Sequence, residues 1–275
     1  TITVGDGVNT VLGGIGGDTI NGGVNRDVVV GDNGSATFND AGVLVAITTS
    51  DAAVAGAYNE LILAGNGPDV VFGGNGVDDI QAGGDLADDV VVGDNGSATF
   101  SADGVLLAIQ TSDAAIGGDD VIDAGDGNNI VIGGYGQDTI TTGSGNDVIL
   151  GDNGIATFTP SAVLTLIAST DEGIGGDDGI TAGDGDNTVI AGFGLDTVTA
   201  GAGSDVVVGD NGTASFSDEG ILISIETTAE GAPRRSLRIE KLTVHLETGP
   251  KPNRVTVSTN GGARVVDMPA SSQQS

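Results

Sequence analysis

Residues 133–141, GGYGQDTIT, place three glycines ahead of one carboxylate, Asp138, and close on an alternating Thr-Ile-Thr. Glycine adopts positive φ angles that strain other residues, while β-branched threonine and isoleucine favour an extended, pleated backbone. The stretch therefore predicts a tight turn that leads into a short strand. Its wider meaning depends on whether the pattern recurs.

The nine-residue pattern recurs along most of the chain. Close copies are GGIGGDTIN at 13–21, GGNGVDDIQ at 73–81 and AGFGLDTVT at 191–199. Weaker copies carry asparagine in place of the aspartate, at Asn9, Asn129 and Asn187. A short fixed period of this kind indicates a stacked all-β solenoid, with a thin core built from the apolar residue at the eighth repeat position.

A second, longer period is superimposed on the first. The tetrapeptide Gly-Asp-Asn-Gly begins at residues 31, 93, 151 and 209, at intervals of 62, 58 and 58 residues. Each copy precedes a short segment ending in phenylalanine, a turn-rich tetrapeptide and an apolar segment, which predicts an inserted β-hairpin. We interpret one block as five nonapeptide-like turns, or about three coils, so the four phenylalanines should recur about every 14 Å. These are Phe38, Phe100, Phe158 and Phe216.

The chain carries a formal net charge of −31, which is distributed unevenly. Residues 1–230 contain 36 acidic side chains and one basic side chain, Arg26, whereas residues 231–275 contain seven basic and three acidic ones. An object this acidic repels itself unless cations intervene, and it is a poor partner for nucleic acid or an anionic membrane. A solvated acidic surface would explain the number of aspartates but not their placement at the sixth repeat position.

That placement has a chemical interpretation. Calcium prefers six to eight oxygen ligands, which carboxylates and backbone carbonyls supply, and glycines let the backbone curl so that its carbonyls point inward. The candidate calcium ligands are Asp18, Asp27, Asp69, Asp78, Asp89, Asp120, Asp138, Asp147, Asp178, Asp196 and Asp205. Turns that have Asn9, Asn129, Asn187 or Glu60 at this position are expected to bind more weakly or to remain empty.

Over about residues 2–217, these segments resemble the RTX repeat, G-G-x-G-x-D-x-U-x, in which U is a large apolar residue. The resemblance implies a parallel β-roll with calcium along its turns, in a protein exported from a Gram-negative bacterium by type I secretion. It also implies a chain that stays unfolded in the low-calcium cytosol and folds outside. Two features depart from the basic motif: the hairpins, and the alanines at the sixth position counted from each Gly-Asp-Asn-Gly, where the carboxylate is missing. These are Ala36, Ala98, Ala156 and Ala214.

Signals of catalysis are absent from the sequence. The chain has no cysteine, and its one histidine, His245, lies in the strand-like LTVHLE. No G-x-S-x-G, G-x-x-x-x-G-K or H-E-x-x-H motif is present, and the repetition of the aspartates favours metal binding over acid–base chemistry. The sequence therefore predicts no enzyme and no catalytic residue, with calcium ions as the cofactor.

Residues 231–275 differ in character from the calcium-binding roll predicted for residues 1–230. We predict a basic, β-rich tail of three strands that caps the roll, links it to a further domain or serves assembly. No segment is apolar enough to insert in a membrane, no signal peptide is recognised, and Thr1 at the start suggests a piece of a longer protein. Two interpretations of the tail's charge stay open: an isolated basic surface, or docking onto a neighbouring copy that joins copies into a homopolymer. The residues concerned are Arg234, Arg235, Arg238 and Lys241.

Taken together, these features predict a calcium-stabilised structural or assembly segment of an extracellular protein at the bacterial surface. An adhesin stalk, a filament subunit and a matrix layer are all consistent with it. The alternative is the carboxy-terminal, calcium-dependent secretion and folding domain of an exported hydrolase. Ice binding is disfavoured, because the third and fifth repeat positions vary too much to form a flat, regular array.

Overall fold

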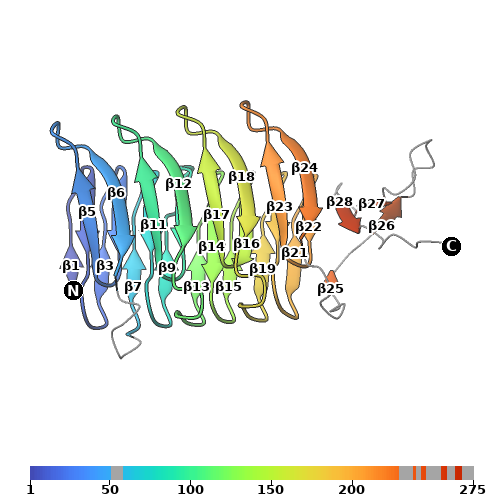
Figure 1. Cartoon of the computed structure of the whole chain (residues 1–275), viewed down its shortest axis with the longest axis horizontal. Coiled ribbons are helices and arrows are strands. Elements are labelled where there is room, and N and C mark those ends of the chain that lie inside the picture. Colours follow the sequence, from blue (N-terminus) through green and yellow to red (C-terminus); the bar gives the residue numbers. More distant parts are fainter. Residues whose placement is uncertain (51–57, 229–237, 240–242, 246–254, 259–263, 268–275) are drawn as a thin grey trace.

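The structure is a computed structural model that describes residues 1–50, 58–228, 238–239, 243–245, 255–258 and 264–267. Every regular element in these residues is a β-strand, and the coils stack along one long axis (Figure 1). None of the described residues belongs to a helix that is long and apolar enough to cross a membrane. The predicted all-β parallel β-roll with inserted hairpins is confirmed.

Two sheets form the roll, and each coil contributes one strand to each of them in parallel pairing. The first sheet contains, in spatial order, β1 (Ile2–Thr3), β3 (Thr19–Asn21), β7 (Leu61–Leu63), β9 (Asp79–Gln81), β13 (Val121–Asp123), β15 (Thr139–Thr141), β19 (Gly179–Ala182), β21 (Thr197–Ala200) and β25 (Arg238–Ile239). The second sheet contains β2 (Asn9–Leu12), β4 (Asp27–Val30), β8 (Val70–Phe72), β10 (Val90–Val92), β14 (Ile130–Gly134), β16 (Val148–Asp152), β20 (Thr188–Ile190), β22 (Val206–Val208), β28 (Arg264–Asp267), β27 (Val255–Ser258) and β26 (Thr243–His245). At the end of the second sheet, β27 and β26 pair antiparallel.

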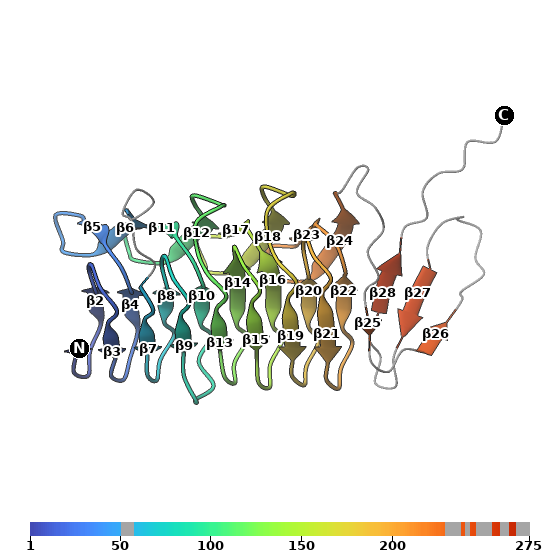
Figure 2. The same cartoon turned by 90° about the horizontal axis from the view of Figure 1, so that it is seen from below.

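The inserted hairpins form a third layer, which we call the hairpin sheet. Its antiparallel strands follow chain order: β5 (Gly34–Phe38), β6 (Leu44–Thr49), β11 (Gly96–Phe100), β12 (Leu106–Thr111), β17 (Gly154–Phe158), β18 (Leu164–Ser169), β23 (Gly212–Phe216) and β24 (Leu222–Thr227). Each hairpin pairs with the next one, as where Ile109 of β12 lies opposite Ala156 of β17. Figure 2 shows these strands along one side of the roll.

The two sheets of the roll differ because only the second sheet is buried on both faces. Strands of the first sheet alternate, so that Ile140 in Thr139–Thr141 is buried while both threonines are exposed. Several inner strands of the second sheet are continuously apolar, like VVF in β8, whose three side chains are all buried. The inner core lies between the two sheets, and a second core joins the second sheet to the hairpin sheet. Continuous apolar runs are expected where a strand has no solvent-facing side.

The expectation of about three coils in each block is wrong. Between the hairpins β11–β12 and β17–β18, the first sheet gains β13 and β15 and the second gains β14 and β16, so a block makes two coils. Neighbouring strands lie about 4.8 Å apart, so successive hairpins recur about every 10 Å rather than every 14 Å. The physical reason is that one hairpin adds two strands to its own sheet, and two coils add two strands to the second sheet. Both layers therefore advance by the same distance per block.

Two of the described strands of residues 231–275 continue the parallel sheets of the roll, and the other two, β26 and β27, add antiparallel strands beside β28. β25 pairs in parallel with β21 of the first sheet, and β28 pairs in parallel with β22 of the second. Four strands are described where three were predicted, and His245 lies in one of them, β26. Arg234, Arg235 and Lys241 lie outside the described residues.

The second core should contribute strongly to stability. Ile109→Ala empties a site where the side chain is 0% exposed, so it should lower the free energy of unfolding in calcium by about 2–5 kcal/mol. Ile223→Ala is the matched control, because that side chain is 65% exposed, and the change should stay within about 0.5 kcal/mol. Urea unfolding followed by circular dichroism measures both variants. Equal effects would contradict the assignment of the hairpin sheet to the core.

Candidate metal centre

The sixth-position side chains form two ladders, one along each edge of the roll. The acidic ladder precedes the first-sheet strands and consists of Asp18, Glu60, Asp78, Asp120, Asp138, Asp178 and Asp196. The mixed ladder precedes or opens the second-sheet strands and consists of Asn9, Asp27, Asp69, Asp89, Asn129, Asp147, Asn187 and Asp205. In both ladders most members accept a backbone N–H from the preceding coil through one side-chain oxygen, as Oδ1 of Asp138 does from Asp120 at 2.9 Å. The candidate residues are therefore brought together in register.

The hairpins are inserted inside turns of the acidic ladder. A Cβ on Gly133 would lie 2.4 Å from Oδ2 of Asp138, five residues later in the same turn. A Cβ on Gly93 would lie 2.3 Å from Oδ2 of Asp120, although a whole hairpin separates those two residues. The turn that opens at Gly93 therefore closes at Asp120. The sixth-position assignment of Ala36, Ala98, Ala156 and Ala214 is wrong, because these alanines lie in the first strands of the hairpins.

Glycine at the start of the turn makes room for the aspartate. A Cβ on Gly133 would also come within 2.1 Å of the carbonyl oxygen of Gly151 in the next coil. Gly136, at the fourth position, has a φ of +124°, which other residues rarely adopt. The glycines therefore serve both the conformation of the turn and the close approach of neighbouring coils.

The second carboxylate oxygen of many ladder aspartates is buried and meets no hydrogen-bond donor among the described residues. This holds for Oδ2 of Asp69, Asp78, Asp120, Asp138, Asp147, Asp178 and Asp205. An unpaired buried charge is strongly unfavourable, so each of these oxygens requires a proton or a cation.

The asparagine turns reveal what surrounds that second atom. Nδ2 of Asn187 donates to the carbonyl oxygens of Gly183 at 2.9 Å and Gly185 at 3.4 Å, which occupy the second and fourth repeat positions. The same nitrogen reaches Oδ1 of Asp205 in the next coil at 3.1 Å. Asn129 likewise donates to Gly125 at 3.0 Å and Gly127 at 3.4 Å. The amide group thus supplies positive hydrogens where several oxygen acceptors converge.

The same convergence in an aspartate turn fits a calcium ion. There the second side-chain atom is itself an oxygen, so acceptors face acceptors and a cation would relieve the repulsion. Within the described residues, no three His, Cys, Asp or Glu side chains are grouped closely enough to hold a metal ion by themselves. Backbone carbonyl oxygens are also ligands that calcium accepts, and the glycine-rich turn brings those of the second and fourth repeat positions close to the side chain.

Burial raises the pKa of several carboxyl groups in the ladders. Burial raises the pKa of Asp69 to about 8, and burial raises the pKa values of Asp89 and Asp178 to about 7. Burial, followed by the charges of Asp120 and Asp178, raises the pKa of Asp138 well above its ordinary range. In the absence of a metal ion, the folded turns therefore favour the protonated carboxyl group.

Not every candidate aspartate has the same surroundings. Both oxygens of Asp27 accept protein donors, from Asn9 and from the backbone of Gly23. Asp18 lies at the first coil, is partly exposed and pairs with the terminal ammonium of Thr1 at 3.4 Å. Glu60 is buried, with both carboxylate oxygens lacking a donor among the described residues. The predicted weakness of the Glu60 turn remains a prediction.

Sequence reasoning missed the aspartates of the Gly-Asp-Asn-Gly segments. Asp94 is buried, and its carboxylate accepts backbone N–H groups from Gly118 at 3.0 Å and from Tyr135. Asp152 repeats this contact with Gly176 at 2.9 Å and Phe193. Burial, then the nearby charge of Asp178, raises the pKa of Asp152 to about 9. The recurrence of this aspartate in all four tetrapeptides was the available signal.

Comparison with known proteins agrees with this geometry. The profile of the RTX calcium-binding nonapeptide repeat matches residues 3–38, 54–86, 116–149, 123–156 and 173–213, which together make up more than half of the chain. A search of curated proteins finds no match.

The raised pKa values predict that acid stabilises the metal-free fold. A folded-state pKa above the ordinary value of 3.8 means that the folded state binds protons more tightly than the unfolded state. This stabilisation is complete below about pH 4. It is lost as the pH rises from about 4 to about 7 or 8, by about 1.4 kcal/mol per group for each pH unit between those values.

We expect the metal-free protein to show more β-structure at pH 5 than at pH 8. Circular dichroism after removal of metal ions on a chelating resin measures the difference. Excess calcium should remove it, since calcium and protons compete for the same oxygens. A β signal in metal-free protein that is unchanged or larger at pH 8 would contradict this account of the ladders.

Proposed function

Because the chain belongs to the family of RTX calcium-binding nonapeptide repeats, we propose that it is a calcium-stabilised structural segment of a secreted bacterial surface protein. The repeats of this family bind calcium ions, several to each array. The observation that carries the proposal is the register of the sixth-position carboxylates, many of which keep a buried oxygen without a donor among the described residues. The proposal assigns the segment no catalytic activity.

In this proposal the calcium ligands are the aspartates of both ladders. They are Asp18, Asp27, Asp69, Asp78, Asp89, Asp120, Asp138, Asp147, Asp178, Asp196 and Asp205, with carbonyl oxygens of the second and fourth repeat positions beside them. Bound calcium supplies positive charge between coils that otherwise repel one another. Folding would then wait until the chain meets extracellular calcium after export. This dependence suits a protein that must leave the cell unfolded.

Calcium should control folding. We expect a largely unfolded chain at neutral pH without metal and cooperative β-structure near the 10⁻⁴–10⁻³ M calcium that extracellular modules require. Asp138→Ala removes one carboxylate from the acidic ladder and should raise the calcium midpoint by roughly twofold or more. Asp79→Ala is the control, because it also removes one carboxylate, but one that is exposed on the first sheet and accepts a hydrogen bond from Gln81. Circular dichroism during a calcium titration measures both. A full β signal without metal at pH 7.5 would overturn the proposal.

Exchanging aspartate and asparagine in the mixed ladder should change how many calcium ions are bound. Asp147→Asn introduces an amide of the kind that already serves at Asn129 and Asn187, so the variant should bind less calcium yet fold at lower calcium concentration. Asn129→Asp should do the reverse, because it replaces a donor with an acceptor. Equilibrium dialysis with metal analysis measures the bound ions. Unchanged stoichiometry in both variants would place the ions elsewhere.

The structural role would extend beyond one copy of the segment. Within the described residues, β5 and β24 are the two edges of the hairpin sheet, and each pairs with one neighbour. Neighbouring hairpins pair in a constant register, in which an alanine of one hairpin lies opposite an isoleucine of the preceding hairpin. The residue before the alanine then lies opposite the residue after the isoleucine: Ser97 opposite Thr48, and Thr213 opposite Ala168. Continuing this register places Ser35 of one copy opposite Glu226 of another. Further blocks or further copies would lengthen the stack into a stalk or filament.

This register can be tested by charge. Ser35→Lys should strengthen association in calcium, since it places an ammonium opposite Glu226, whereas Ser35→Glu should weaken it by like-charge repulsion. Each cross-strand pair is worth roughly 0.2–1 kcal/mol, so the association constant should shift by at most about fivefold in either direction. Sedimentation velocity over a concentration series measures the effect. Opposite signs support β5–β24 contact, and identical behaviour of the two variants contradicts it.

A further inference from the structure

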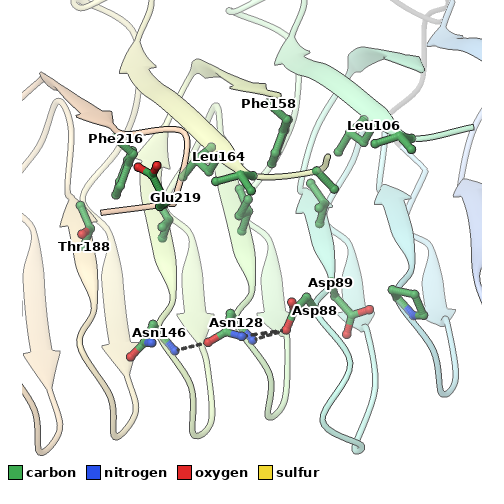
Figure 3. Close-up of a pocket in the computed structure, with 18 of the residues that line it drawn as sticks. Asp88, Asp89, Leu106, Asn128, Asn146, Phe158, Leu164, Thr188, Phe216 and Glu219 are labelled. Atoms are coloured by element: carbon green, nitrogen blue, oxygen red, sulfur yellow. Dashed lines mark hydrogen bonds between the residues drawn. The ribbon is translucent and has the colours of Figure 1, made fainter. Parts of the chain in front are cut away.

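A groove of about 1130 Å³ lies between the hairpin loops and the outer face of the second sheet. Apolar residues of the second sheet, among them Val90 and Val148, line one wall, and hairpin residues such as Phe158 and Phe216 line the other. Figure 3 shows Phe158 and Phe216 on the hairpin side, with Asp88 and Asn146 on the turns across from them. The groove borders the mixed ladder, because Asp69, Asp89 and Asn187 also line it.

One end of the groove is filled by the chain's own arginine. Arg26 donates from Nη1 to the carbonyl oxygen of Gly104 at 2.5 Å, and its guanidinium lies 5.1 Å from the ring centroid of Phe100. Asp69 lies near enough to act on its charge. A guanidinium over an aromatic face is a favourable cation–π contact, particularly where water is excluded. This end of the groove therefore accommodates a guanidinium group, that of Arg26.

The hairpins β17–β18 and β23–β24 have the same phenylalanine and loop backbone as β11–β12, but no arginine of the described residues lies over them. Their loops have the same left-handed residue, with φ of 82° at Gly104, 65° at Ala162 and 79° at Gly220. The residues that correspond to Arg26 for these loops are Asp88 and Asn146, which directly precede ladder aspartates just as Arg26 precedes Asp27. Both side chains are too short to span the groove as Arg26 does.

Burial differs accordingly. Phe100 is 5% exposed and Gly104 is buried, because Arg26 covers them. The equivalent Phe158 and Phe216 are only partly buried, and Ala162 and Gly220 are exposed. The two later sites thus keep the aromatic ring and the loop backbone but lack the cation.

We propose that the groove binds an extended, arginine-bearing peptide segment of a partner protein, with guanidinium groups over Phe158 and Phe216. Charge supports this occupant, because Asp88, Asp186 and Glu219 also line the groove, and the roll has Arg26 as its one base before residue 231. The two sites are two coils apart, or about 10 Å. A polyproline II chain rises about 3.1 Å per residue, so arginines three residues apart match this spacing. The proposal adds a ligand site to the calcium-bound roll and does not depend on its role as a stalk or filament.

The test uses a labelled nonapeptide with arginine at every third position and proline between, and an identical peptide with lysine in place of arginine. Fluorescence anisotropy is measured in saturating calcium at about 0.15 M salt, where long-range attraction is largely screened. The arginine peptide should bind at least about tenfold more tightly than the lysine peptide, because a planar guanidinium stacks on an aromatic ring better than an ammonium.

Variants identify the site. Asp88→Arg should supply the missing side chain and weaken binding of the arginine peptide by about tenfold or more, whereas Asp79→Arg makes the same charge change on the opposite sheet and should alter it less than about threefold. Phe216→Leu should also weaken binding, while Phe38→Leu, outside the groove, should not. Circular dichroism in calcium checks that every variant is folded. Equal binding of both peptides, or equal effects of Asp88→Arg and Asp79→Arg, would overturn the proposal.

Discussion

The structure depends on one electrostatic constraint: oxygen acceptors converge at the sixth position of many repeat turns. In the asparagine turns the amide hydrogens of Asn129 and Asn187 satisfy the carbonyl oxygens of the second and fourth positions. In the aspartate turns the equivalent atom is an oxygen, so a proton or a calcium ion must take the place of those hydrogens. The requirement for a cation is therefore built into the backbone of the turn and into its side chain together.

The alternation of Asn129, Asp147, Asn187 and Asp205 in the mixed ladder has a physical consequence. Each amide carries no charge where an aspartate would carry one, and it donates to the carbonyl oxygens that we propose as calcium ligands in the aspartate turns. The acidic ladder has no such relief among its described members, and it also packs against the buried carboxylates of Asp94 and Asp152. The two edges of the roll are thus unequal in their demand for cations, and the edge with the inserted hairpins has the greater demand.

The hairpins change the roll from two layers into three. A strand with one solvent-exposed face needs one apolar residue in each nonapeptide, as Ile140 shows, but a strand covered on both faces needs apolar residues throughout, as in β8. Because a hairpin and two coils each add two strands, the third layer stays aligned over the whole stack. The same periodicity repeats the aromatic groove sites, which are covered by Arg26 at one end and open beyond it.

The sequence by itself determined the repeat, the parallel roll, the hairpins and the ladder residues, because a nine-residue period can place Asp138 and its equivalents only in stacked turns. It could not determine how many coils a block makes, since Gly93 and Asp120 belong to one turn although 26 residues lie between them. Closing that turn across a hairpin is decided by strand pairing between distant segments. The roles of Asp94 and of Arg26 were likewise decided by tertiary structure, because their partners, Tyr135 and Gly104, are brought near only when the coils and hairpins stack. The local sequence determines the conformation of each turn. Contacts between layers depend instead on the distance along the roll axis that each sheet gains in one block.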